Sequence, residues 1–85
     1  MDATFDITDP DIETTGDYLM FTITDGDARI PATISGTALA VLDEHRTGDD
    51  RAAFLANKGR IREAAYEMRR RHPELNLIAL STMNF

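Results

Sequence analysis

The side chains best suited to chemistry are few, and they stand far apart in the sequence. His45 and His72 fall at the ends of two expected helices, where we expect each to place charge at a helix C-terminus rather than to bind a metal. Ser35 stands just before the first of these helices, and capping that helix accounts for its hydroxyl. There is no cysteine, no phosphate-binding glycine loop and no HExxH pair. The sequence therefore predicts no catalytic residue, no cofactor and no metal site.

One acidic stretch has part of the spacing of a calcium-binding loop. Asp9, Asp11 and Glu13 alternate as the first ligands of such a loop do. Thr14, however, stands where the sharp turn needs glycine, and Met20 stands where a bidentate glutamate is needed. We interpret the stretch as a solvated acidic loop.

A run of three arginines is the best candidate for contact with an anion. Arg69, Arg70 and Arg71 lie at the end of the expected second helix. Because Arg71 lies nearer the buried stripe of that helix than Arg70, the three do not share one face. A nucleic-acid surface normally has a wider basic footprint with aromatic side chains for stacking. The run therefore supports an alternative hypothesis, a weak anion or nucleic-acid binder, rather than the main one.

Length and composition favour one small globular domain. We expect a single domain over residues 1–85, with an acidic leader (1–17, a short strand and a loop) and a core (18–85). The lack of cysteine fits a reducing cytoplasm, and the acidic first residues do not resemble a signal peptide. No segment has the roughly 20 apolar residues that cross a bilayer. We therefore expect a cytoplasmic protein with no membrane partner.

Charge is distributed unevenly along the chain. Residues 1–50 hold twelve acids and two bases, a net charge of −10, whereas residues 51–85 hold seven bases and three acids, a net charge of +4. The favoured interpretation is internal complementarity, with acidic strands and loops facing a basic helix. The other interpretation is a basic patch for an acidic partner.

Alternating patterns predict three strands in the first half of the chain. Residues 2–8 alternate apolar and polar side chains, as a half-buried strand does. Residues 18–24 and 27–34 flank Asp25-Gly26, a pair favoured in two-residue hairpin turns. Pro31 lacks an N–H and predicts an edge strand or a gap in the ladder. A turn at Asp25-Gly26 pairs three residues of the first hairpin strand with three of the second: Ile23 with Ala28, Phe21 with Ile30, and Leu19 with Ala32.

Two helices are expected next. The first covers about residues 36–46 and begins at the Ser35 cap. The second covers 50–72 as one long helix, because an apolar stripe recurs through it and Pro73 ends it. The stripe consists of Phe54, Ile61, Ala65 and Met68. Gly59 lies off the stripe, and its role does not follow from the sequence.

The last segment, Leu75 to Phe85, predicts a strand that is apolar on both faces. Leu77, Ala79, Met83 and Phe85 would share one face, and Ile78 and Leu80 the other. If two helices cover one face of a four-stranded sheet, the uncovered face presents an apolar patch, which often marks a partner surface or a homodimer face. The residues expected in that patch are Tyr18, Met20, Ile78 and Leu80.

Most of the chain, residues 18–85, resembles a bacterial family of domains of unknown function, the one numbered 1488. The resemblance rests on YLMFTITDGDARIPATISGTALAVL, on AAFLANKGRIREAAYEM and on the closing LIALSTMNF. The shared pattern consists of a strand, the turn at Asp25-Gly26, Ile34-Ser35 entering a short helix, a helix with Phe54, Asn57 and Ile61, and a final strand. Lys58-Gly59 and the acidic leader depart from it.

The resemblance implies a small cytoplasmic α/β domain with no established activity. At Asn57 we expect a structural hydrogen bond to the loop or the hairpin rather than a ligand contact.

These observations predict an α+β domain of two layers in the order β-β-β-α-α-β, with a mostly antiparallel sheet and both helices packed on one face. The predicted role is a non-catalytic protein-interaction or accessory module that pairs with itself or with another protein. A small enzyme is the least favoured hypothesis.

Overall fold

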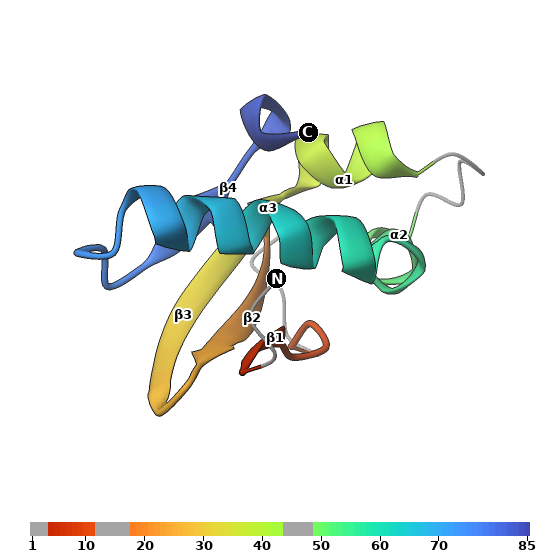
Figure 1. The fold of residues 1–85 in the computed structure, drawn as a ribbon. Helices are drawn as coiled ribbons and strands as arrows, with labels where there is room; N and C mark the ends of the chain where they lie inside the picture. Colours follow the sequence, from red (N-terminus) through yellow and green to blue (C-terminus); the bar gives the residue numbers. More distant parts are fainter. Residues whose placement is uncertain (1–3, 12–17, 44–48) are drawn as a thin grey trace.

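The computed structural model describes residues 4–11, 18–43 and 49–85. All the helices described lie on one side of a four-stranded sheet with the strand order β1-β2-β3-β4 (Figure 1). β1 pairs with β2 and β2 with β3 in antiparallel fashion, and β3 pairs with β4 in parallel. The expected α+β class, with a mostly antiparallel sheet covered by helices on one face, is confirmed. The elements are β1 (Phe5–Ile7), β2 (Tyr18–Asp25), β3 (Ala28–Ser35), α1 (Gly36–Leu42), α2 (Asp50–Ala56), α3 (Lys58–Arg71), β4 (Ile78–Leu80) and a 3-10 helix, η1 (Thr82–Asn84).

The β2–β3 hairpin forms where it is expected, but its register differs by two residues. Asp25 pairs with Ala28, so the two turn residues are Gly26 and Asp27 rather than Asp25 and Gly26. Gly26 has a φ of 61°, and glycine adopts this conformation without the steric cost of a side chain. Because the shift is an even number of residues, every side chain keeps its predicted face. The predicted pairs were wrong, and the observed ones are Ile23 with Ile30, Phe21 with Ala32, and Leu19 with Ile34.

Pro31 lies on an inner strand and within the continuous β2–β3 ladder, so the edge strand or gap expected from its missing N–H was wrong. Its β2 partner, Thr22, directs its backbone toward the β1 side, where it accepts a hydrogen bond from the Thr8 N–H and donates its own N–H to Thr8 Oγ1. Pro31 therefore needs no N–H on the β2 side. On the other side, β4 pairs only with Ala32–Ile34, one residue beyond Pro31.

The expected long helix over residues 50–72 is two helices, which is a correction to the sequence interpretation. The break falls at Asn57, whose Nδ2 donates to the carbonyl oxygens of Leu42 (3.0 Å) and Ala53 (2.9 Å). Leu42 is the last residue of α1, so its carbonyl has no partner within its own helix. The chain turns at Asn57, with α2 packed beside α1 and α3 running along the sheet (Figure 1). At the start of α2, Asp49 Oδ1 accepts from the N–H groups of Arg51 and Ala52.

The first expected helix begins where it is predicted, whereas the last expected strand is much shorter than predicted. The Ser35 cap is confirmed, since its hydroxyl accepts a hydrogen bond from the Ala38 N–H. The structure describes α1 only to Leu42, and residues 44–46 of the predicted helix 36–46, with His45, lie outside the described residues. Of the expected strand over residues 75–85, only Ile78–Leu80 form a strand. Thr82–Asn84 form the capped turn of η1 instead.

The core fills the space between the helices and one face of the sheet. Phe21 of β2 and Phe54 of α2 meet edge to face with ring centroids 5.2 Å apart. Among the described residues, no polar or charged side chain is buried. The buried apolar residues are Phe5, Ile7, Leu19, Phe21, Ile23, Ile30, Ala32, Ile34, Ala38, Leu39, Leu42, Ala53, Phe54, Ile61, Ala64, Ala65, Ile78 and Leu80.

Candidate interaction surfaces

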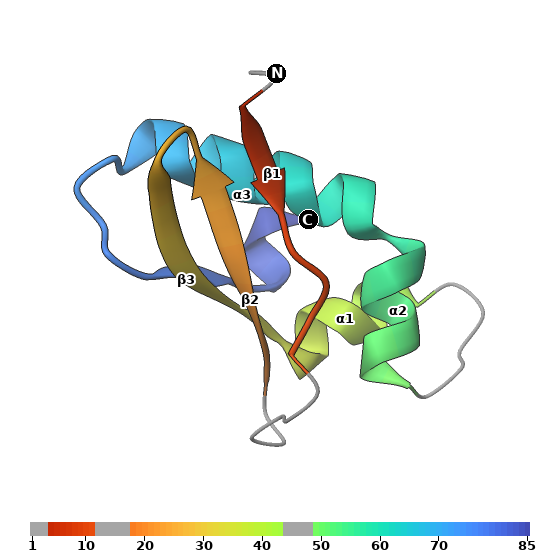
Figure 2. The same ribbon diagram turned by 90° about the horizontal axis from the view of Figure 1, so that it is seen from below.

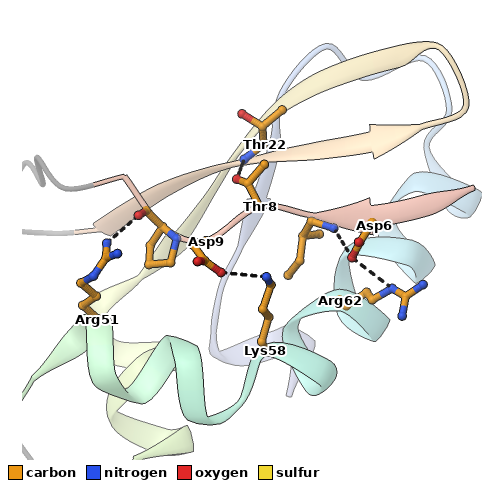
Figure 3. Close-up of polar contacts among 9 residues, drawn as sticks. Asp6, Thr8, Asp9, Thr22, Arg51, Lys58 and Arg62 are labelled. Carbon is orange, nitrogen blue, oxygen red and sulfur yellow. Dashed lines mark hydrogen bonds and ion pairs between the residues drawn. The ribbon is translucent and has the colours of Figure 1, made fainter.

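One side of α2 and α3 uses its bases to hold the N-terminal segment (residues 4–11). Lys58 Nζ lies 2.8 Å from Asp9 Oδ1, in an exposed ion pair near the start of α3 (Figure 3). The hydrogen bond and the charge of Lys58 lower the pKa of the Asp9 carboxyl from its ordinary value. This pair joins the acidic first half of the chain to the basic second half.

Two arginines of the same helices bind backbone carbonyls of the N-terminal segment. Arg51 donates to the Pro10 carbonyl oxygen (2.6 Å), and Arg62 donates to that of Phe5 (2.7 Å) (Figure 3 shows both arginines beside the segment). The Arg62 Nε lies 3.7 Å from Asp6 Oδ1 and has no hydrogen-bond partner. The bases on this side of the helices are therefore engaged within the domain, in agreement with internal charge complementarity.

The three arginines proposed as an anion site do not converge. Arg69 binds Asp25 Oδ2 through Nε (3.0 Å) and the Pro73 carbonyl through Nη1 (2.7 Å). Arg70 donates to the Tyr66 hydroxyl and lies over that ring, 5.7 Å from its centroid. The contact with Tyr66 raises the pKa of Arg70.

Arg71 lies on the other side of α3, where it lines a groove facing η1. With Arg69 neutralised by Asp25 and Arg71 turned away, the arrangement weakens the anion-binding hypothesis.

The uncovered face of the sheet contains only two of the four residues expected in its apolar patch. Tyr18 and Met20 are half-buried and alternate along β2 with the core residues Leu19 and Phe21. Ile78 and Leu80 are 0% and 2% exposed, so their prediction as surface residues was wrong.

Pairing with β3 determines which face of the sheet each β4 side chain lies on. Ile78 pairs with Ala32 and Leu80 with Ile34, and paired residues place their side chains on the same face of a sheet. Because Ala32 and Ile34 face the core, Ile78 and Leu80 do so as well, and Ala79 lies on the uncovered face beside Thr33.

The corrected surface, which we call the outer sheet patch, consists of uncharged residues, and the exposed Arg29 of β3 borders it beyond Pro31 on the same face. In Figure 2, β2 and β3 lie in front of α3, and no described element covers the near side of the sheet. Successive cross-strand pairs, Met20 with Thr33 and Thr22 with Pro31, form its centre. The outer sheet patch consists of Tyr18, Met20, Thr22, Pro31, Thr33 and Ala79.

A groove between α3 and η1 has a volume of about 620 Å³. Its edge on α3 carries two bases and two acids, and Met83 of η1 is 95% exposed beside it. Sequence reasoning missed this groove because it placed Met83 on a strand. The signal that could have found it is Ser81-x-x-Asn84, a spacing typical of a helix cap.

The remaining candidate chemistry is sparse in the described part of the chain. Residues 4–11, 18–43 and 49–85 contain no group of three His, Cys, Asp or Glu side chains that could hold a metal ion. His72 lies at the end of α3, with Nδ1 3.6 Å from Glu74 Oε1. Of the acids with calcium-like spacing, Asp9 pairs with Lys58 and Glu13 lies outside the described residues. None of the helices described has both the length and the hydropathy needed to cross a bilayer.

Comparisons of the chain with protein-family models, with curated proteins and with solved structures find no match.

Proposed function

We propose that this domain is a non-catalytic interaction module that pairs with a second copy of itself through the outer sheet patch. The observation that carries the proposal is the uncharged character of this patch on a chain with a net charge of −6. The exposed positions of α3, by contrast, are mostly arginine and glutamate. A surface of neutral, half-buried side chains on a charged domain is typical of a site that meets another protein.

Self-association suits this patch better than contact with a charged ligand. Two copies of an acidic protein repel each other at long range, and a contact between uncharged surfaces adds no further repulsion. A sheet face with Tyr18 at one end, and with the pairs of Met20 with Thr33 and Thr22 with Pro31 at its centre, can pack on itself about a twofold axis, as the sheets of a β-sandwich do.

The dimensions of the patch predict a weak dimer. β2 and β3 have eight residues each, or about 26 Å at ~3.3 Å per residue, whereas β1 and β4 have only three. The patch uses only residues 18–22 of β2, residues 31–33 of β3 and Ala79 of β4, so its area is smaller than the roughly 800 Å² that each partner of a stable complex buries. We expect a Kd in the micromolar range, about −8 kcal/mol at 1 μM.

The experiment is sedimentation velocity of the whole chain from about 0.1 μM to about 100 μM, a range that brackets the expected Kd. Met20→Lys combined with Thr33→Lys should give a monomer at every concentration, because two buried lysines would face the partner's patch. Ala40→Lys, at an exposed position of α1, is the matched control and should leave the dimer intact. A wild-type chain that stays monomeric at the highest concentration would rule the proposal out.

We also propose that the protein acts in the cytoplasm and belongs to the bacterial family that it resembles. The lack of cysteine and the structural role of Asn57, one of the residues that carry the resemblance, support these two inferences. Cell fractionation with an antibody to the native protein tests the first. Structures of family members test the second: the same asparagine contact with the preceding helix would support it, and the lack of that contact would contradict it.

A further inference from the structure

The groove between α3 and η1 has a regular order of charges along one edge. Arg60, Glu63, Glu67 and Arg71 follow one another at spacings of three, four and four residues, which places them in a row along a helix. Among the described residues, none of the four makes an ion pair within 4.0 Å. The opposite side of the helices differs, because Lys58, Arg62 and Arg69 have partners there.

The floor and the far edge of the groove are apolar. Met68 and Phe85 are partly buried and pack against the core, and Ala64 is buried between them and the helix axis. Met83 stands at the far edge with 95% of its surface exposed. Methionine is a flexible and polarizable side chain that adapts to different apolar partners.

Met83 is held in place by a capped turn. Ser81 Oγ accepts a hydrogen bond from the Met83 N–H (3.3 Å), and Asn84 Oδ1 accepts one from the Ser81 N–H (2.8 Å). The Asn84 N–H also donates to the Ser81 carbonyl oxygen (3.0 Å). These bonds hold the backbone of an exposed apolar residue in a defined position beside the groove, which reduces the entropy lost when a partner binds.

We propose that this groove binds an amphipathic helix of another protein whose charges run acid, base, base, acid. The two bases, one helical turn apart, would pair with Glu63 and Glu67, and the flanking acids would pair with Arg60 and Arg71. The apolar face of that helix would cover Met68, Met83 and Phe85.

A second copy of this chain is not the occupant that the charges favour. The order base, acid, acid, base reads the same from either end of α3. Two copies with fully overlapped grooves would therefore bring like charges together. Antiparallel α3 helices would place Arg60 of one chain against Arg71 of the other, and parallel helices would place each charge against the same residue of the other copy. Like charges in contact oppose association.

The test uses two synthetic helical peptides of about four turns. The complementary peptide has two central lysines one turn apart, a glutamate one turn beyond each, and leucines on its apolar face. The control peptide has the same length and the same leucines, but its lysines and glutamates are exchanged. Binding to the whole chain is measured by fluorescence anisotropy, and the contact surface is located by amide chemical shifts.

The complementary peptide should bind at least about ten-fold more tightly than the control peptide, because several exposed pairs change from attraction to repulsion. Glu63→Lys with Glu67→Lys should abolish this preference, because each peptide would then meet two attractive and two repulsive pairs. Met83→Ser should weaken the complementary peptide several-fold, whereas Leu55→Ser, at an exposed position of α2 outside the groove, should not.

Equal affinity for the two peptides, no binding of either, or shifts confined to the sheet would each overturn the proposal. Loss of self-association in Met83→Ser would also overturn it, since the groove would then be an interface between copies. Because the dimer proposal concerns the other side of the domain, each of the two can fail without the other.

Discussion

Asn57 joins α1, α2 and α3 through one side chain and its own backbone. Its Nδ2 donates to Leu42 and Ala53, its N–H donates to the Ala53 and Phe54 carbonyls, and its carbonyl accepts from the Ile61 N–H. Asn57 thus has the expected structural role, but its side chain binds the end of α1 and the preceding turn of α2 rather than the loop or the hairpin.

The first prediction concerns this residue. Asn57→Ala should lower the free energy of unfolding by about 1–3 kcal/mol, because the half-buried Leu42 carbonyl loses its donor. Asn57→Asp should cost more, since a carboxylate would face two carbonyl oxygens. Urea unfolding measures both. Asn76→Ala, at an exposed position, is the control and should change stability by less than about 0.5 kcal/mol; an equal effect at the two positions would contradict the assigned role.

A second prediction at this scale contrasts two glycines. A Cβ added at Gly59 meets nothing within 4 Å and φ there is not positive, so Gly59→Ala should raise stability by about 0.5–1 kcal/mol. Gly26 has a φ of 61°, so Gly26→Ala should lower stability by about 1–2 kcal/mol although space is also available. Thermal unfolding of the two variants should therefore shift in opposite directions. A fall in the Gly59→Ala midpoint would show that the start of α3 needs glycine for a reason other than space.

At the scale of elements, β1 depends on the helices as well as on the sheet. It contributes only three residues to the sheet, at its edge. Phe5 and Ile7 enter the core, Arg62 binds the Phe5 carbonyl, and the ion pair of Lys58 with Asp9 follows just beyond the strand.

The pKa of Asp9 predicts how this attachment responds to pH. Because the folded-state pKa is lowered by Lys58, the stabilisation is present above the unfolded value of about 3.9 and is lost as the pH falls through the lower folded value. Amide exchange of β1, compared at pH 7 and in acid, should therefore show an acid-induced loss of protection that is smaller in Asp9→Asn. Because the pair is exposed, the difference should shrink in high salt. A wild type and variant with the same pH dependence would show that the ion pair contributes nothing to the attachment.

At the scale of the whole molecule, net charge and surface distribution act together. A chain of net charge −6 should dimerise more readily as salt rises, because salt screens repulsion between copies while the proposed contact itself carries no charge. Sedimentation at about 50 mM and about 500 mM NaCl tests this, since the screening length falls several-fold over that range. A dimer that weakens with salt would indicate that ion pairs, and not the outer sheet patch, hold the copies together.

Local chemistry made several features of this protein predictable from the sequence. Ser35 before an apolar run predicted the helix cap, and the alternation of Leu19, Phe21 and Ile23 predicted which face of β2 is buried. Both depend on neighbours within a few residues, so the sequence contains the information needed. The uneven charge predicted the contact of the basic helices with the acidic N-terminal segment, though not its individual pairs.

Other features depend on residues that are distant in the chain, and only the tertiary structure decides them. The apolar stripe continues across Asn57, so periodicity alone predicted one helix, and the Leu42 carbonyl determined the break. Ile78 and Leu80 belong to a strand whose neighbouring positions are also apolar, so the sequence pattern was compatible with either face of the sheet. Pairing with Ala32 and Ile34 places both side chains in the core. The same pairing leaves the outer sheet patch uncharged, and the turn after β4 brings Met83 beside α3. Sequence periodicity determines which residues share a face of one element, whereas long-range pairing determines which way that face points.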